Sequence, residues 1–304
     1  MIRRIVFSDN LPFLQHVPDS SVDMIYIDPP FNTGKVQRAT RMQTVRSPEG
    51  DRTGFQGRRY QTNVLGRKEF ADAFDDYLGF LEPRLREAWR ILAKHGSIYV
   101  HLDFREVHYV KVLMDEVFGR NCFLNDIVWA YDYGARSTKK WPAKHDSILL
   151  YVKDPLDYHF DIDAVDRIPY MAPGLVGPEK AARGKTPTDT WWHTIVTTNG
   201  RERTGYPTQK PLGVVERAVK ASCIPNGVVM DFFAGSGTSG EAALRNGRHF
   251  ILVDNNAEAM EVMAKRFAGV EGVVWENCGL VCDPGEVDTA PSLFARHPGR
   301  SQGR

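Results

Sequence analysis

Short apolar segments alternate with helical patterns along most of this chain, and that alternation constrains its fold more than any other feature. Each apolar run has the length and composition of a buried strand. Between several of the runs, apolar residues recur at helical spacing. Strand, helix and strand in repetition predict a mostly parallel sheet covered by helices on both faces, which is the doubly wound α/β class. The predicted strands cover residues 2–7, 22–27, 96–102, 125–130, 147–152, 228–233 and 249–254.

The helical pattern is clear in several segments, and one long region has neither pattern. Residues 155–206 are rich in Pro, Gly and Thr and show little periodicity, so we expect an irregular subdomain inserted into the α/β fold. Pro83 interrupts the first helical segment and predicts two helices there. The polar tail after Pro284 is expected to be flexible. The predicted helices cover residues 70–94, 105–118, 211–223, 239–246 and 257–267.

Composition excludes several classes of protein. The 304 residues are 42% apolar and 25% charged, which is a globular composition. No uninterrupted apolar stretch approaches the roughly 18 to 20 residues that span a bilayer, and the start, MIRRIVFSDN, has no signal-peptide core. We therefore expect a cytoplasmic protein without a membrane partner. The four cysteines form neither a disulfide framework nor a paired zinc motif, so no metal site is expected.

Positive charge is concentrated in two segments, although the net charge of the whole chain is only +1. Residues 36–68 hold eight Arg or Lys and two acidic residues, a net charge of +6, and show no lasting apolar period. This pattern predicts a long, mobile loop. Residues 133–144 add four positive charges and no acid. Each segment is either a solvated loop or a surface for a polyanion.

A glycine-rich turn lies between the predicted strand 228–233 and the helix after it. Gly235, Gly237 and Gly240 form the pattern G-x-G-x-x-G, and Asp254 ends the following strand. Glycines let backbone N–H groups approach a ligand closely, and an acid at this place binds ribose hydroxyls. The residues alone fit a dinucleotide, another adenosine cofactor, or a tight turn without a ligand.

A second motif, Asp28-Pro29-Pro30-Phe31, follows the predicted strand 22–27. The carboxyl end of a strand in an open α/β sheet is where ligands bind, and two prolines fix the backbone there. A carboxylate, a backbone carbonyl and an aromatic face suit a planar base with an exocyclic amine. Taken alone, the motif fits a turn that only ends a strand better than it fits a binding site.

Together the two motifs resemble the signature of the amino-methyltransferases that use S-adenosylmethionine. D-P-P-F comes first here, and the glycine motif, FAGSG at 233–237, comes in the last third of the chain. This order resembles the β class of bacterial DNA amino-methyltransferases, whereas RNA and protein methylases with a similar motif usually carry the glycines first. The resemblance extends over residues 8–35, 82–119 and 206–238.

The resemblance implies a Rossmann-like class I methyltransferase fold in circularly permuted order, with S-adenosylmethionine as cofactor. It gives catalytic roles to Asp28, Pro29, Pro30 and Phe31. In the family, residues matching Thr208 and Lys210 help hold the methionine carboxylate, and those matching Asp9, Asp231 and Asp254 lie near the adenine, the amino group and the ribose. The implied cofactor-binding residues are Asp9, Thr208, Lys210, Asp231, Phe233, Ala234, Gly235, Ser236, Gly237, Thr238 and Asp254. Tyr206 departs from the family, which often has His there.

The resemblance also implies the substrate, an amine of a base in double-stranded DNA. The target atom lies inside the duplex, so the base must be extruded into the pocket. In the family D-P-P-Y/F mostly accompanies adenine N6 and S-P-P-Y mostly accompanies cytosine N4, so we expect adenine N6 and keep cytosine N4 as the alternative. The basic segments supply the expected phosphate contacts. These contacts are Arg58, Arg59, Tyr60, Arg136, Lys139 and Lys140.

Four regions follow from this interpretation. We expect residues 1–130 to form the catalytic half, 131–206 a target-recognition insertion, 207–284 the cofactor-binding half and 285–304 a flexible tail. By resemblance, a homodimer and a cognate restriction endonuclease are possible partners.

Two other functions compete with methyl transfer. A nicotinamide oxidoreductase would use the same glycines and Asp254, but it leaves D-P-P-F and the +6 segment unexplained. A DNA-binding protein without catalysis would not need D-P-P-F. His101 lies near the end of the predicted strand 96–102 and Asp103 follows it, and we expect a core or turn role for them. For Trp191 and Trp192 we expect packing under the inserted loops.

Overall fold

The computed structural model divides into two compact units, which are described separately. One unit comprises residues 1–29 and 78–304, and the other comprises residues 30–77. The tail after Pro284 lies outside the described residues. The structure describes residues 2–32, 35–46, 52–53, 59–72, 74–132, 136–197 and 200–279.

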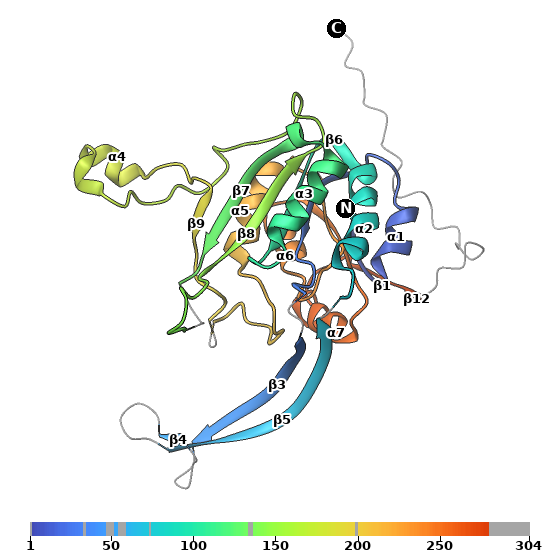
Figure 1. The fold of residues 1–304 in the computed structure, drawn as a ribbon, viewed down its shortest axis with the longest axis vertical. Helices are drawn as coiled ribbons and strands as arrows, with labels where there is room; N and C mark the ends of the chain where they lie inside the picture. Colours follow the sequence, from blue (N-terminus) through green and yellow to red (C-terminus); the bar gives the residue numbers. More distant parts are fainter. Residues whose placement is uncertain are drawn as a thin grey trace. The chain divides into compact units, whose positions relative to one another are not determined.

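The larger unit is built on one nine-stranded sheet (Figure 1). Neighbours from β12 to β6 are parallel, and β8 is antiparallel to the strands on both sides. This mostly parallel sheet confirms the predicted class. In spatial order its strands are β12 (Val274–Gly279), β1 (Arg3–Ser8), β11 (His249–Asp254), β10 (Val228–Asp231), β2 (Val22–Ile27), β6 (Leu92–Leu102), β8 (His145–Val152), β7 (Phe123–Ala130) and β9 (Thr190–Trp192).

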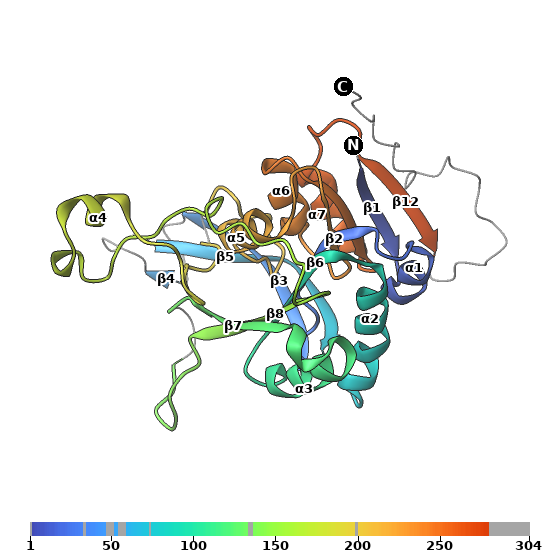
Figure 2. The same ribbon diagram turned by 90° about the horizontal axis from the view of Figure 1, so that it is seen from above.

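Helices cover both faces of the sheet (Figure 2). On one face α5 (Leu212–Ser222), α6 (Thr238–Arg245) and α7 (Ala257–Arg266) bury their apolar stripes in a core shared with the strands. On the other face lie α2 (Tyr77–Ile91) and α3 (Val107–Phe118), with α1 (Asn10–His16) near the β1 side. Because both faces are covered, the central strands are apolar almost throughout, as the sequence of β2 shows.

The helix predicted at 70–94 begins later than expected and is not divided. Residues 70–72 belong to a strand, and α2 starts at Tyr77 and continues through Pro83. A proline in a helix removes one backbone hydrogen bond. Here the buried Leu81 and Leu85, on either side of Pro83, keep the helix packed against the core.

The prediction of a mobile loop at 36–68 is wrong for residues 36–46, 52–53 and 59–68, which form strands, and its other residues lie outside the described ones. In the smaller unit, β3 (Lys35–Arg46) and β5 (Arg59–Asp72) form a long antiparallel hairpin, and β4 (Arg52–Thr53) pairs with β5 (Figure 1). Antiparallel pairing satisfies the backbone groups that each strand turns toward its partner. This pairing does not depend on an alternation of apolar residues, so the periodicity of the sequence did not reveal it.

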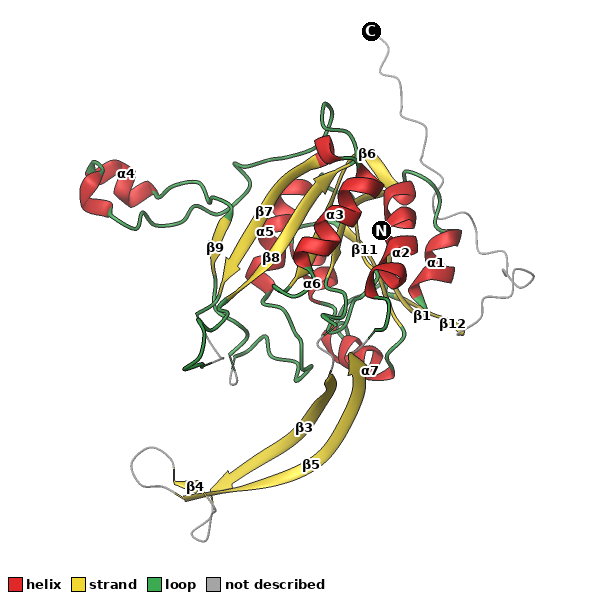
Figure 3. Ribbon diagram, viewed as in Figure 1, coloured by secondary structure: helices red, strands yellow, loops and turns green. Residues whose placement is uncertain are grey.

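The region 155–206 is largely irregular, as predicted (Figure 3). It leaves the sheet after β8, carries the short helices η3 (Pro173–Leu175) and α4 (Pro178–Arg183), and returns as β9. An isolated antiparallel β-bridge between Ile168 and Lys185 joins the two ends of the segment that carries η3 and α4. The sequence patterns missed α1, α4, β9 and β12. In the described parts of the chain, no helix has the length and apolar character needed to cross a membrane.

Candidate active site

The two motifs meet at the point where the strand order of the sheet reverses. β10 and β2 are parallel neighbours, with Val229 opposite Met24 and Met230 opposite Ile25. From β10 the chain continues through α6 to β11 on one side, and from β2 it continues through α2 to β6 on the other. In open α/β sheets, ligands bind outside the carboxyl ends of the strands at such a switch point, and we call this place the crevice. Asp28 and the glycine turn follow these two ends, so both motifs lie at this crevice.

Two glycines of the turn adopt backbone conformations that other residues avoid. Gly235 has φ +49° and Gly237 has φ +75°. A Cβ atom at Gly235 would lie 3.1 Å from the ring of Tyr206. The Gly235 N–H donates to the Asp254 carboxylate over 2.7 Å. The acid predicted for ribose hydroxyls thus also holds the turn, and burial raises its pKa.

Other members of the turn tie it to its neighbours. The Ala234 N–H donates to the Val253 carbonyl of β11 over 3.1 Å. The hydroxyls of Ser236 and Thr238, both buried, lie 3.0 Å apart, and the Thr238 hydroxyl donates to the Lys210 carbonyl over 3.3 Å. These contacts fix the start of α6 against the loop that carries Lys210.

Asp231 is a buried carboxyl group at the end of β10. It accepts from the Phe233 N–H over 3.0 Å and from the Ser239 hydroxyl. Burial raises the pKa of Asp231 to about 7, against the hydrogen bonds from Ser239 and Phe233 that lower it. The Phe233 ring packs against Phe80 at a centroid distance of 6.1 Å. A buried carboxyl group with this pKa is suited to a cationic ligand group.

Asp28 and Lys210 form an ion pair across the crevice. The Lys210 Nζ lies 2.5 Å from Oδ2 of Asp28, and the two side chains are only 11% and 17% exposed. Oδ1 of Asp28 is buried and has no hydrogen-bond partner among the described residues. A buried carboxylate oxygen without a donor is costly, so it favours a ligand that brings an N–H group.

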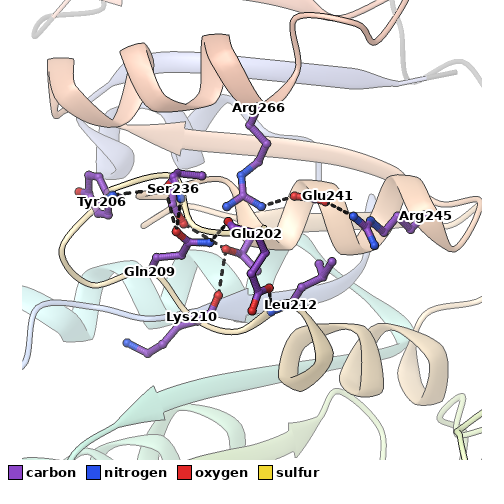
Figure 4. A network of polar contacts seen from close by, with 11 residues as sticks. Glu202, Tyr206, Gln209, Lys210, Leu212, Ser236, Glu241, Arg245 and Arg266 are labelled. Atoms are coloured by element: carbon purple, nitrogen blue, oxygen red, sulfur yellow. Dashed lines mark hydrogen bonds and ion pairs between the residues drawn. The ribbon is translucent and has the colours of Figure 1, made fainter. Parts of the chain in front are cut away.

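The loop at 206–211 is held in shape by a side chain that sequence reasoning missed (Figure 4). The Gln209 carbonyl oxygen accepts from both the N–H and the hydroxyl of Thr204, each over 2.8 Å. Its amide donates to the Glu202 carbonyl over 2.6 Å. The predicted Thr208 is exposed beside it. In the sequence, the position of Gln209 between the expected binding residues Thr208 and Lys210 was the one indication of this role.

Asp9 lies at the carboxyl end of β1 and caps α1, where its carboxylate accepts from the Leu11 N–H over 2.9 Å. Arg84 lies 3.4 Å from the same carboxylate and donates to Asn10 over 2.6 Å. Asn10 in turn donates to the Phe232 carbonyl over 2.7 Å. Asn10 and Arg84 therefore connect the β1 end to the glycine turn, a role that sequence reasoning did not assign.

A buried polar chain extends from the Asp28 side of the crevice. The Tyr26 hydroxyl lies 3.1 Å from Nδ1 of His101, whose Nε2 lies 3.2 Å from Asp146. The Tyr131 hydroxyl donates to the other oxygen of Asp146 over 3.3 Å. Despite burial, hydrogen bonding to His101 and the charges of His101 and Lys210 lower the pKa of Asp146. His101 thus has the satisfied core role predicted for it, but beside the crevice.

The second basic segment lies at the same edge of the sheet. It connects the end of β7 to the start of β8, and Ser147 of β8 pairs with Leu102 at the end of β6. Arg136, Lys139 and Lys140 are all exposed on it.

The remaining predicted residues belong to the smaller unit or lie outside the description. Pro30 and Phe31 follow Pro29 into the smaller unit. Arg59 is exposed on β5, and Tyr60 is its next residue. Arg58 lies outside the described residues. Their roles stay predictions.

The crevice therefore gathers carboxyl groups from four strand ends and one lysine. Asp9, Asp28, Asp231 and Asp254 follow or end β1, β2, β10 and β11. Such a set can bind a ligand that carries amino and hydroxyl groups, with Lys210 available for a carboxylate. An adenosine linked to an amino acid has this combination of groups.

Comparisons with known proteins show which family the chain belongs to. The chain is 28% identical over 277 residues to the DNA adenine methyltransferase YhdJ of Escherichia coli (strain K12), covering 87% of this chain and 82% of that protein. Its fold resembles the PvuII DNA methyltransferase (cytosine-N4-specific), with a TM-score of 0.60, 16% identity and coverage of 89% and 88% of the two chains. It also resembles M1.HpyAVI in its complex with S-adenosylmethionine, with a TM-score of 0.56, 19% identity and coverage of 88% and 99%. The family model of N6 and N4 methyltransferases, described as DNA methylase, matches residues 22–266, and the chain belongs to this family.

Proposed function

We propose that this DNA methylase transfers a methyl group from S-adenosylmethionine to the N6 amine of adenine in duplex DNA, after the base is extruded from the helix. The observation that carries the proposal is the buried Oδ1 of Asp28. It has no hydrogen-bond partner among the described residues, and it lies at the switch point beside the glycine turn. An exocyclic amine supplies the N–H that this oxygen lacks.

The groups at the crevice fit the cofactor. S-adenosylmethionine, when bound, supplies an electrophilic methyl group on a sulfonium. Asp231 holds the cofactor amino group: among the described residues its buried carboxyl group accepts from the Phe233 N–H and the Ser239 hydroxyl and has no cationic partner, and an ammonium would stabilise its charged form. Asp254 is to accept from the ribose hydroxyls, and Asp9 is to lie near the adenine. The backbone of the turn contributes through Phe233, Ala234, Gly235, Ser236, Gly237 and Thr238.

Asp28 and the Pro29 carbonyl accept hydrogen bonds from the target amine. The lone pair of this amine is delocalised into the ring of the base, which makes the nitrogen a weak nucleophile. Two acceptors on the two N–H groups favour a pyramidal nitrogen and stabilise the positive charge that develops on it. Pro30 fixes the turn and Phe31 is to stack on the base.

Lys210 exchanges its partner Asp28 for the cofactor carboxylate when the cofactor binds. It neutralises Asp28 at 2.5 Å, and it is also the residue proposed, with Thr208, to hold the methionine carboxylate. A cofactor carboxylate competes with Asp28 for the same ammonium. Binding of the cofactor thereby releases Oδ2 of Asp28 as well, so that both carboxylate oxygens can accept from the amine, which favours cofactor before DNA.

Adenine is favoured over cytosine by the acid at the first position of D-P-P-F. YhdJ is named as an adenine enzyme, and the PvuII enzyme, named as cytosine-N4-specific, shares the fold. Either amine accepts the same chemistry, so the choice rests on the resemblance of the motif.

The test is methylation of mixed-sequence duplex DNA with methyl-labelled S-adenosylmethionine, followed by digestion to nucleosides and mass spectrometry. Label in N6-methyladenine is the expected result. Label in N4-methylcytosine would show that the target base is cytosine. No labelled nucleoside from protein that binds the cofactor would overturn the proposal.

The regional assignments are part of the same proposal. Residues 1–130 form the catalytic half, 131–206 the target-recognition insertion and 207–284 the cofactor-binding half. Arg136, Lys139 and Lys140 contact phosphate. A homodimer, a cognate restriction endonuclease and a cytoplasmic location stay predictions.

A further inference from the structure

The loop between β7 and β8 presents an almost fully exposed indole. Trp141 is 95% exposed. Large aromatic side chains are normally at least half covered, because exposing an indole forfeits the hydrophobic gain of burying it. A single exposed Trp needs no partner by itself, so the case for one depends on how the loop is built and where it lies.

Within this loop, residues 137–140, next to Trp141, form a turn that is held by hydrogen bonds. The Ser137 hydroxyl accepts from the N–H groups of both Lys139 and Lys140, each over 3.2 Å. The Lys140 Nζ lies 5.6 Å from the centre of the Phe104 ring. A side chain on a braced turn loses little further backbone freedom when it enters another surface, so contact there costs less entropy.

Charge defines the partner of this turn. Residues 136–144 contain four basic residues and no acid. Arg136, Lys139 and Lys140 are exposed around Trp141. An exposed aromatic ring among cations is the combination that binds nucleic acid, with cations on phosphates and the ring on a base.

The base of the loop connects directly to the site. The Tyr131 N–H donates to the Lys144 carbonyl over 3.1 Å, which closes the loop where β7 and β8 end and begin. The Tyr131 hydroxyl donates to Asp146, which also contacts His101. His101 contacts the hydroxyl of Tyr26, which lies on β2 two residues before Asp28. Trp141 is thus carried by a turn that stands at the edge of the crevice.

We propose that Trp141 stacks inside the DNA duplex, in the place from which the target base is extruded. Extrusion leaves two neighbouring base pairs without a stacking partner, and an indole that fills this gap offsets part of the cost of extrusion. The inference rests on the proposed function, since it requires a base that leaves the duplex.

The experiment compares two DNA substrates that differ only at the target base pair. The recognised sequence is first read from DNA methylated by the wild-type protein. One substrate carries a normal target pair, and the other a mismatch that leaves the target base unpaired. Trp141→Ala is expected to lower kcat/KM on the paired substrate by about 10- to 100-fold and on the mismatched substrate by only about threefold or less.

Two further variants separate stacking from other roles. Trp141→Phe keeps an aromatic ring and is expected to retain most of the activity. Leu156→Ala is the matched control, because Leu156 is also 95% exposed but follows β8 at the opposite edge of the sheet, and it is expected to behave as wild type. Light scattering and circular dichroism check assembly and folding of each variant.

Several results would overturn the inference. Equal losses on the paired and mismatched substrates would make Trp141 a contact for the DNA backbone only. Loss of a dimer in Trp141→Ala would make it a contact between two copies of the chain. If the wild type methylates no DNA, the proposed function fails, and the stacking contact is judged by fluorescence instead. Quenching by duplex DNA of the indole signal that distinguishes wild type from Trp141→Phe would support it, and unchanged signal would reject it.

Discussion

Asp28 is the residue on which the proposed chemistry depends, and its two oxygens have different environments. Oδ2 pairs with the Lys210 ammonium, while the buried Oδ1 has no partner among the described residues. The ion pair compensates for burying the charge, and the second oxygen stays available for a donor. One carboxylate can therefore be both stable in the crevice and ready to bind an amine.

Replacing Asp28 by Ala or Asn is expected to lower the rate of methyl transfer by at least about 100- to 1000-fold, the scale of losing one preorganised group at a reacting centre. Binding of S-adenosylhomocysteine is expected to persist or to strengthen, because Lys210 loses the carboxylate that competes for it. Single-turnover rates and isothermal titration measure the two effects. Asp126→Asn, at an exposed position of β7, is the control. Unchanged transfer in Asp28→Ala would remove this residue from the mechanism.

Asp231 makes the folded protein less stable as the pH rises. A carboxylate in an ion pair has the opposite effect. The folded-state pKa of Asp231, about 7, lies above the ordinary value of 3.8, so the folded protein holds this proton more tightly than the unfolded chain does. Its contribution to stability is complete below about pH 4 and is lost as the pH rises to about 7, with a total change of about 4 kcal/mol. We expect Asp231→Asn to remove this decline, as measured by urea unfolding at several pH values. Equal pH profiles of wild type and variant would contradict the assignment.

The same carboxyl group couples cofactor binding to protons. If Asp231 binds an ammonium, its pKa falls on binding and a proton is released near neutral pH. Affinity for S-adenosylhomocysteine is therefore expected to increase as the pH rises from about 6 to about 8. Titration calorimetry in buffers of different ionisation enthalpy counts the proton. Binding without proton release would place the amino group elsewhere.

At the scale of elements, the position of α6 depends on Gly240, which lies at a close packing contact and not in a turn. A Cβ atom at Gly240 would lie 2.6 Å from Leu252 of β11 and 3.0 Å from Phe267. The helix can approach β11 closely only because this side chain is absent. This approach sets the start of α6 beside the glycine turn, so packing of the helix contributes to the shape of the site.

Gly240→Ala is expected to destabilise the protein by about 1–3 kcal/mol, because the added methyl group overpacks the contact between α6 and β11. Gly269→Ala is the matched control, since its Cβ would meet open space. Urea unfolding curves of the two variants and the wild type give the comparison. A neutral Gly240→Ala would mean that α6 can shift, and cofactor affinity would then show whether the site shifts with it.

Elements were predictable where burial imposes a pattern. The first and last residues of β2 and β11 were predicted correctly. Both faces of these strands are covered, so each strand has the same length as its apolar run. The β3–β5 hairpin was missed because its residues show no lasting apolar period from which strands could be recognised. β9 was missed because three residues are too few to show a period.

At the scale of the whole molecule, the net charge of +1 conceals local basic surfaces. A polyanion responds to the local surface, since charges farther away than about 10 Å are screened by salt. Arg136, Lys139 and Lys140 lie together at the carboxyl edge of the sheet, on the side of the proposed pocket.

Replacing Lys139 and Lys140 by Ala is expected to weaken binding to all DNA sequences alike. The slope of log K against log salt concentration should decrease by about 0.9 for each phosphate contact that is lost. Lys265→Ala, at an exposed position near the end of α7, is the control. Fluorescence anisotropy at several salt concentrations measures the slope. An unchanged slope would show that these lysines do not touch phosphate.

The sequence by itself determined the α/β class, the two motifs and the residues they contain, because buried strands, glycine turns and proline turns are local requirements that appear directly in the residues. Only the tertiary structure decided that Asp28 and the glycine turn follow neighbouring strands, that Lys210 pairs with Asp28, and that His101 and Asp146 lie beside them. These contacts join residues far apart in the chain. They depend on strand order and on helix packing, which no local pattern of residues records.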